Sequence, residues 1–198
     1  DGSKRVIDPG ILWLYRGIEI KPAAPLKDVT FNDGEEALIV AGVDANSRLQ
    51  LWRFNRHHDF LMDETTWEPQ PVELPDLNAR FKRVALDSNL RWLFALSEDN
   101  QLHVFNISES GSGTITLQSR VSLNKPVTDM RMLVGGISLL VSHTDGSIEQ
   151  WFMAREAGAW KLASVRTFQI GDKVQIGDKD SGGKDGGLIA VEQRRKGF

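Results

Sequence analysis

The stretch WLFALSEDNQLHVF, from Trp92 to Phe105, decides the fold of this chain. It begins with an apolar segment, continues through a polar turn at Glu98, Asp99 and Asn100, and ends in a second apolar segment that closes on an aromatic residue. Segments of this length and composition predict two β-strands joined by a tight turn.

The same local design recurs in other parts of the chain. Its second strand ends in an aromatic residue each time, and equivalent positions are separated by 38 to 53 residues. A strand, a polar turn and an aromatic-ended strand repeated at such intervals are typical of β-propeller blades. We expect the repeated aromatic residues to pack between blades rather than to form a ligand cage. They are Trp13, Trp52, Phe105 and Trp151.

The repeats divide the chain into three fuller units and partial ones at either end. The fuller units run from Leu26 to Leu74, from Phe81 to Leu123 and from Val127 to Ile170. Their hairpin strands are apolar on both faces, as expected for sheets stacked between neighbours. We therefore predict an all-β fold, a partial β-propeller of WD40-like four-stranded blades, with about three full blades in a single domain spanning residues 1–198.

The first unit holds an irregular segment. Residues 57–70 are rich in charge, and we expect a long excursion there before a short outer strand at 71–74. The strands expected in this unit are 26–31, 38–41, 49–54 and 71–74.

Residues 171–187 form a polar, glycine-laden stretch that we expect to be a flexible loop.

Three blades are fewer than the roughly four to eight of a closed propeller. We therefore expect the chain to be a fragment of a larger protein. Strand edges and apolar faces at its ends would then favour self-association.

Composition narrows the function only slightly. The net charge is −3, which gives no general attraction to nucleic acid, and the absence of cysteine excludes disulfides and thiolate metal sites. The longest apolar stretch, 133–141, is too short to cross a bilayer, which needs roughly 20 residues.

Three stretches resemble a known family. They are Leu133–Val141, Gly146–Met153 and Glu192–Phe198, and in this order they are similar to the large extracytoplasmic insert of some bacterial phosphate ABC-transporter permease subunits. In that family a propeller-like region lies between the first transmembrane helix and the permease core. The resemblance is looser from Leu26 to Asn124.

The resemblance implies a non-catalytic domain on the periplasmic side of the bacterial inner membrane, within a phosphate importer. It implies docking to the phosphate-binding protein or to other importer subunits, or regulation of uptake. Contact with the membrane would come through transmembrane helices of the parent protein. No cofactor and no nucleic-acid partner are expected.

Few residues suggest chemistry. His57 and His58 lie near acidic residues, but neighbouring strand residues point to opposite faces and do not easily share a metal ion. The same geometry separates Ser142 from His143 and disfavours a nucleophile assisted by a base. The stretch 178–189 lacks the last ligand of a calcium loop, and 178–185 lacks the glycine and hydroxyl of a phosphate-binding loop.

The basic run Arg194, Arg195 and Lys196 is the candidate contact for a partner or an anion. Two other functions stay open. One is a cytoplasmic WD40-type scaffold unrelated to transport, and the other is a propeller enzyme with a metal in its central channel. The enzyme is the weakest of the three, because the expected inner strands at 81–86 and 127–132 offer few acidic residues and no histidine.

Overall fold

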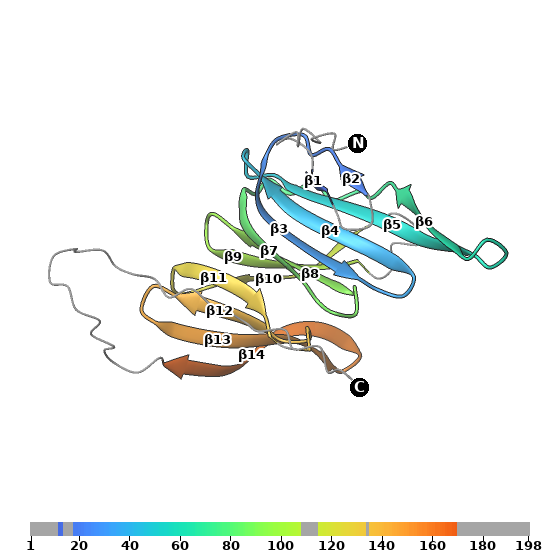
Figure 1. The fold of residues 1–198 in the computed structure, drawn as a ribbon. Helices are drawn as coiled ribbons and strands as arrows, with labels where there is room; N and C mark the ends of the chain where they lie inside the picture. Colours follow the sequence, from blue (N-terminus) through green and yellow to red (C-terminus); the bar gives the residue numbers. More distant parts are fainter. Residues whose placement is uncertain (1–11, 14–17, 108–114, 134, 170–198) are drawn as a thin grey trace, which may run out of the picture.

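The decisive stretch forms a β-hairpin. In a computed structural model that describes residues 12–13, 18–107, 115–133 and 135–169, strand β8 (Trp92–Ser97) pairs with β9 (Gln101–Asn106) in antiparallel register. All six residues of β8 are buried, which confirms that this hairpin is apolar on both faces. The regular elements of the described residues are all strands (Figure 1).

Twelve of these strands make three antiparallel sheets of four, each a simple meander along the chain, and the sheets are the three predicted blades. Blade 1 contains β3 (Leu26–Asp33), β4 (Ala37–Asp44), β5 (Leu49–Asp59) and β6 (Glu64–Gln70). Blade 2 contains β7 (Phe81–Leu86), β8, β9 and β10 (Thr116–Ser122). Blade 3 contains β11 (Val127–Met132), β12 (Leu139–His143), β13 (Ser147–Glu156) and β14 (Ala159–Gln169).

A small two-stranded sheet precedes blade 1. It consists of β1 (Leu12–Trp13) and β2 (Glu19–Ile20). Ile20 of β2 and the preceding Ile18 pack against apolar residues of blade 1, namely Leu38, Val40 and Phe54. The sheet therefore covers part of the first blade's outer face.

The prediction for the outer strand of blade 1 was wrong. The expected strand at 71–74 is absent, and β6 lies instead within the supposed excursion, where it pairs with an extended β5 from Arg53–Gln70 to Asp59–Glu64. Residues 57–70 are thus the distal half of a long hairpin. Blade 3 differs only in detail: Ile137 was expected to start a strand but lies before β12 and is 63% exposed.

The core lies between the blades. One apolar cluster joins blades 1 and 2 through Ile39, Leu93 and Phe105, and a second joins blades 2 and 3 through Phe94 and Leu139. The repeated aromatic residue contributes to an apolar cluster between neighbouring sheets wherever its side chain is described. Trp52 packs toward the β1–β2 side, Phe105 toward blade 1 and Trp151 toward blade 2, which confirms the predicted packing role.

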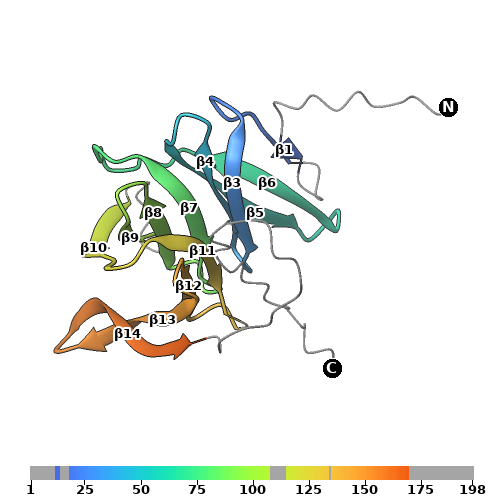
Figure 2. The same ribbon diagram turned by 90° about the vertical axis from the view of Figure 1, so that its left-hand side faces the viewer.

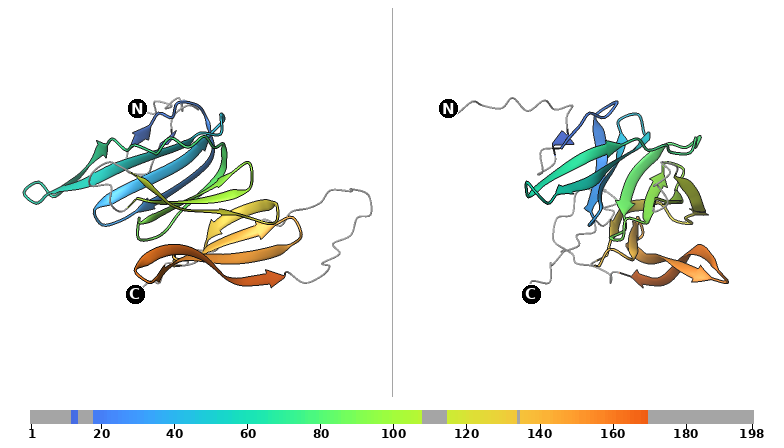
Figure 3. Two further views of the ribbon diagram at one scale, coloured as in Figure 1. Left: turned by 180° about the vertical axis from the view of Figure 1, so that it is seen from behind. Right: turned by 90° about the vertical axis from the view of Figure 1, so that its right-hand side faces the viewer.

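The inner strands β3, β7 and β11 lie next to one another, and the outer strands diverge from them like vanes (Figure 2). Each inner strand carries a β-bulge at the same level, between Leu26 and Asp28, Phe81 and Arg83, and Val127 and Asp129. The views in Figure 3 show the same succession of three blades from behind and from the other side. A bulge increases local twist, which suits strands that converge on one axis.

Apolar side chains are exposed on the two outermost faces of the stack. On blade 1, Val29 and Phe31 of β3 are 41% and 52% exposed, and on blade 3, Val165 and Phe168 of β14 are 47% and 44% exposed. The described residues contain no helix long and apolar enough to cross a membrane.

Candidate functional site

The β4–β5 turn is built around one carboxylate. Asp44 Oδ1 accepts hydrogen bonds from the N–H groups of Asn46 and Arg48, each at 2.9 Å, and Oδ2 accepts one from Gln50 Nε2 at 2.8 Å. Asp44 is fully buried, and Ser47 follows with a positive φ of 64°. The polar turn read from the sequence therefore has a fixed shape that presents Asn46 and Arg48 outward.

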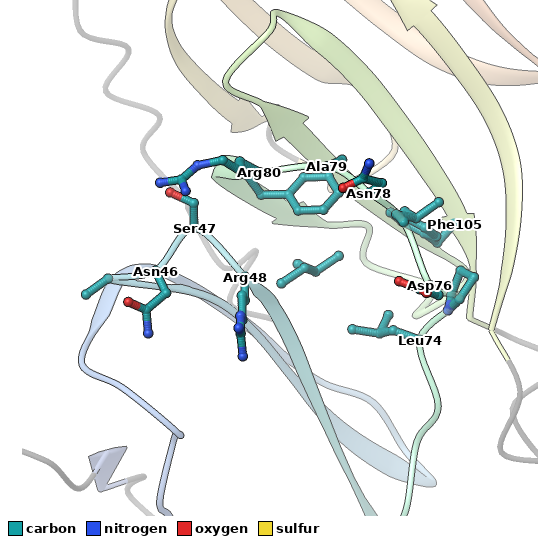
Figure 4. Close-up of a pocket in the computed structure, with 14 residues that line it drawn as sticks. Asn46, Ser47, Arg48, Leu74, Asp76, Asn78, Ala79, Arg80 and Phe105 are labelled. Atoms are coloured by element: carbon teal, nitrogen blue, oxygen red, sulfur yellow. The ribbon is translucent and has the colours of Figure 1, made fainter.

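A groove of about 890 Å³ lies beside this turn, between blades 1 and 2. We call it the inter-blade groove (Figure 4). Its opposite wall is the segment that connects β6 to β7, and apolar side chains from both walls and from β9 lie in it. It is lined by residues 45–49, residues 74–81 and Phe105.

Several polar side chains at the groove have no partner among the residues that the structure describes. The side chains of Arg48, Asp76 and Asn78 are exposed, and they make no hydrogen bond or ion pair with the described part of the chain. Apolar surface at the groove is supplied by Leu74, Phe105 and other lining residues. Exposed polar side chains together with apolar surface are a composition found at binding surfaces.

Glu98 joins the two blades by bonding two residues that line the groove, Ser47 and Arg80. Its carboxylate accepts a hydrogen bond from Ser47 Oγ at 2.6 Å and one from Arg80 Nε at 2.9 Å, and Lys27 Nζ lies 3.8 Å away. The bonds from Ser47 and Arg80 lower the pKa of Glu98. Arg80 is therefore neutralised within the protein, whereas the charge of Arg48 remains available to a ligand.

The described lining residues of the groove include few of the groups used in acid–base catalysis. Among its described lining residues there is no histidine, and its hydroxyl, that of Ser47, is engaged by Glu98 and by Lys27 Nζ at 2.6 Å. As far as the described residues go, the groove offers hydrogen bonding, one positive and one negative charge without a partner, and apolar contact. This chemistry suits the recognition of a polypeptide surface.

A second polar cluster, which was not predicted from the sequence, lies on the inner strands. Asp129 is 2% exposed and its two oxygens lie 3.8 Å from Arg83 Nε and 3.4 Å from Arg131 Nε. Asp28, at the equivalent position of blade 1, accepts a hydrogen bond from the Val84 N–H at 2.8 Å. Burial raises the pKa of Asp28, although the bond to Val84 and the charge of Arg83 oppose the rise.

This inner-strand cluster holds the blades together. A cavity of about 230 Å³ beside it is lined by Lys27, Lys82, Arg83, Val127 and Thr128. Burial and the neighbouring Arg83 lower the pKa of Lys82. Because Asp129 is matched by two arginines, its carboxylate serves an internal ion pair rather than a metal site.

Two of the histidines considered above, His58 and His143, have protein partners. His58 Nδ1 lies 3.1 Å from Thr65 Oγ1, and Nε2 lies 3.7 Å from Asp63, whereas His57 is exposed beside it on β5. His143 Nδ1 lies 3.2 Å from the carbonyl oxygen of Lys125, while Ser142 Oγ lies 2.7 Å from Thr128 Oγ1. Ser142 and His143 therefore contact different neighbours. In the described ranges no set of three or more acidic or histidine side chains is placed to hold a metal ion.

The remaining candidates lie outside the described residues. They are the basic run Arg194, Arg195 and Lys196, the stretches 178–189 and 178–185 weighed as calcium and phosphate loops, and the glycine-rich loop 171–187.

Solved propellers share this architecture. The chain is similar to Hsv2 of Kluyveromyces marxianus, with a TM-score of 0.52 and 18% identity over 79% of this chain and 50% of that one. It is similar to a putative 6-phosphogluconolactonase of Bacteroides fragilis, with a TM-score of 0.52 and 16% identity over 77% and 42%. A third match is the Cps50 (Swd1) β-propeller domain of Myceliophteria thermophila, with a TM-score of 0.51 and 16% identity over 81% and 52%.

These likenesses establish a propeller fold and nothing finer. The chain spans about half the length of the propellers it matches. No protein-family profile matches the sequence, and no curated protein is detectably similar to it. The matched proteins have different names and roles, as expected for a fold that carries many functions.

Proposed function

We propose that this chain is a non-catalytic binding module, the extracytoplasmic domain of the permease subunit of a phosphate ABC importer. In this role it docks the phosphate-binding protein or another importer subunit at the periplasmic side of the inner membrane. The link to the importer is supported by the resemblance of Leu133–Val141, Gly146–Met153 and Glu192–Phe198 to the permease insert.

The observation that carries the binding role is the inter-blade groove. It combines apolar lining residues with the side chains of Arg48 and Asp76, which have no partner within the described ranges, and its walls are a turn and a connecting segment. Recognition residues are commonly placed on loops that a rigid scaffold positions. The paired blades 1 and 2 provide that scaffold, because the Asp44-centred turn and the Glu98 junction fix the walls.

The test is binding of the full-length permease subunit to its cognate phosphate-binding protein, with Arg48→Glu as the variant. Reversal of a charge at an interface weakens binding by about tenfold or more, and phosphate uptake by cells should fall accordingly. The control is Arg155→Glu, an exposed arginine on β13 of blade 3, which should leave both readings unchanged.

Two results would contradict the proposal in different ways. If the parent protein binds no importer subunit and uptake is unaffected by deletion of residues 26–169, the importer assignment fails. If binding occurs but Arg48→Glu behaves like Arg155→Glu, the domain docks through a different surface.

A further inference from the structure

The tip of the β5–β6 hairpin presents three consecutive large apolar side chains to solvent. Phe60, Leu61 and Met62 are 88%, 97% and 69% exposed, and no other large apolar side chain of the described chain is as exposed. We call these three residues the apolar tip. Single exposed apolar residues are normal on protein surfaces, but a contiguous group of this kind marks a contact site.

The apolar tip projects away from the blades. In Figure 1 the hairpin extends past the other strands of blade 1, and Figure 3 shows the same projection from behind. None of its three side chains joins an inter-blade apolar cluster. The tip is therefore not a part of the core that happens to reach the surface.

The tip has a defined conformation. Asp59 Oδ1 accepts hydrogen bonds from the N–H groups of Leu61 at 2.8 Å and Met62 at 3.3 Å, and the ring of His58 lies edge-on to Phe60 with centroids 4.7 Å apart. Asp63 completes the turn with a φ of 53°. A surface that is already ordered loses little conformational entropy on binding.

The charges around the tip are acidic. Asp59, Asp63 and Glu64 flank the three apolar residues, and there is no lysine or arginine between 57 and 64. An anionic lipid surface attracts basic segments and repels acidic ones. The charge pattern therefore favours a protein partner over a membrane.

We propose that the apolar tip inserts into an apolar pocket of a partner protein, and that lysine or arginine side chains on the rim of this pocket pair with Asp63 and Glu64. This surface lies outside the inter-blade groove, and the inference rests on the proposed function only in taking the chain to be a binding module. Insertion of a projecting hydrophobic anchor into a pocket is a common source of interface energy.

The first experiment locates the partner. The photo-crosslinking residue p-benzoylphenylalanine is placed at Leu61 in the full-length protein in cells, and at Glu68 on the same hairpin as the control. We expect a crosslink from position 61, and none from position 68, to a protein segment that contains apolar residues and lysine or arginine. Crosslinks only to lipid, only to a second copy of this chain, or to nothing would overturn the proposal.

The second experiment measures the energetics with the crosslinked protein as the probe. Leu61→Ser should weaken binding about 10- to 100-fold, since a buried leucine is lost from the contact. Ile137→Ser, which removes an equally large exposed side chain from blade 3, should have no effect. Glu64→Lys should weaken binding more than Glu68→Lys. If Leu61→Ser had the same effect as Ile137→Ser, or Glu64→Lys the same effect as Glu68→Lys, the proposed contact would be refuted.

A vesicle assay tests whether the apolar tip binds lipid instead of protein. In flotation with vesicles of phosphatidylethanolamine and phosphatidylglycerol, the tip should not bind the protein to the vesicles. Recovery that Leu61→Ser abolishes would show that the tip binds lipid and would overturn the proposal. The groove variant Arg48→Glu should leave the position-61 crosslink intact, so failure of the proposed function and failure of this inference are distinguishable.

Discussion

The side chain of Asn100 fastens blade 2 to blade 3 by accepting a hydrogen bond from the N–H of Val127 at 3.1 Å. Its amide nitrogen donates to the carbonyl oxygens of Leu123 at 2.9 Å and Lys125 at 2.7 Å. One residue in the β8–β9 turn therefore holds the connection between β10 and β11. Asn100 also has a positive φ of 65°, which asparagine tolerates better than most residues.

We expect Asn100→Ala to lower the free energy of unfolding by about 2 kcal/mol, because three hydrogen bonds of roughly 0.5–1.5 kcal/mol each are lost. Asn100→Asp should also destabilise the protein, since it replaces the donor to two carbonyl oxygens with an acceptor. The measurement is urea denaturation, with Asn78→Ala as the exposed control, expected within about 0.5 kcal/mol of the wild type. Equal stability of the Asn100 and Asn78 variants would show that the junction contributes nothing.

The glycine pair in the β11–β12 turn offers an internally controlled test. Both residues have positive φ, 94° at Gly135 and 65° at Gly136, but a Cβ at Gly136 would lie 2.5 Å from Ser88 Cβ, whereas a Cβ at Gly135 would meet nothing within 4 Å. Gly135→Ala should cost about 1–2 kcal/mol for the backbone conformation alone. Gly136→Ala should cost clearly more, because it also separates blade 2 from blade 3. Thermal denaturation of the two variants side by side measures the difference, and a difference of zero would refute the close contact.

His103 should make stability dependent on pH. It is 2% exposed, its ring lies near Phe81 and Phe105, and neither ring nitrogen has a hydrogen-bond partner among the described residues. Burial, assisted by the charge of Arg120, lowers the pKa of His103 from its ordinary value of 6.5. The unfolded chain therefore binds a proton more readily than the folded one, and stability should fall as the pH drops below about 6.5.

The check is the free energy of unfolding of wild type and His103→Leu between pH 5 and 8. The variant should lose the part of the slope that the wild type shows between the ordinary pKa of the histidine, 6.5, and the lower value in the folded state. An unchanged slope would mean that His103 takes up a proton in the folded protein without cost.

The apolar residues on the outermost faces predict self-association of the isolated chain. Val29 and Phe31 on β3 are 41% and 52% exposed, and burying such side chains against a second copy is favourable. Light scattering should show mass increasing with concentration, and Phe31→Lys should shift the chain toward monomer. Ile137→Lys, an exposed position away from this face, is the control. A strictly monomeric wild type at high concentration would contradict the prediction.

The repeated hairpins could be predicted from sequence because their pattern is local. In Trp92–Phe105 the apolar strands, the polar turn and the terminal aromatic residue all lie within one segment, and each has the role expected of it. The second half of the β5–β6 hairpin was missed because β6 is polar and contains Pro69. The run Thr65-Thr66-Trp67, rich in residues that favour strands, was the available signal.

Contacts between blades were harder to predict, because they depend on how separate sheets pack. Arg83 and Asp129 are distant in sequence, and their ion pair exists only because β7 and β11 are neighbours. The β-bulges that place Asp28, Arg83 and Asp129 at one level of the inner strands are visible only in the structure. The groove has the same origin, since residues 45–49, residues 74–81 and Phe105 form it only when blades 1 and 2 are docked.

Blade 3 is attached to blade 2 at opposite ends of the inner strands. Asn100 holds Lys125 and Val127 at the start of β11, and Ser88 holds the other end, with its N–H and Oγ donating at 2.8 Å to the carbonyl oxygens of Gly136 and Gly135. A force on blade 3 would act on the Asn100 and Ser88 attachments at the same time, so blade 3 should not rotate about either one. Blades 2 and 3 should therefore move as one rigid body. A force applied to β14 should be transmitted to β7 before the two blades separate.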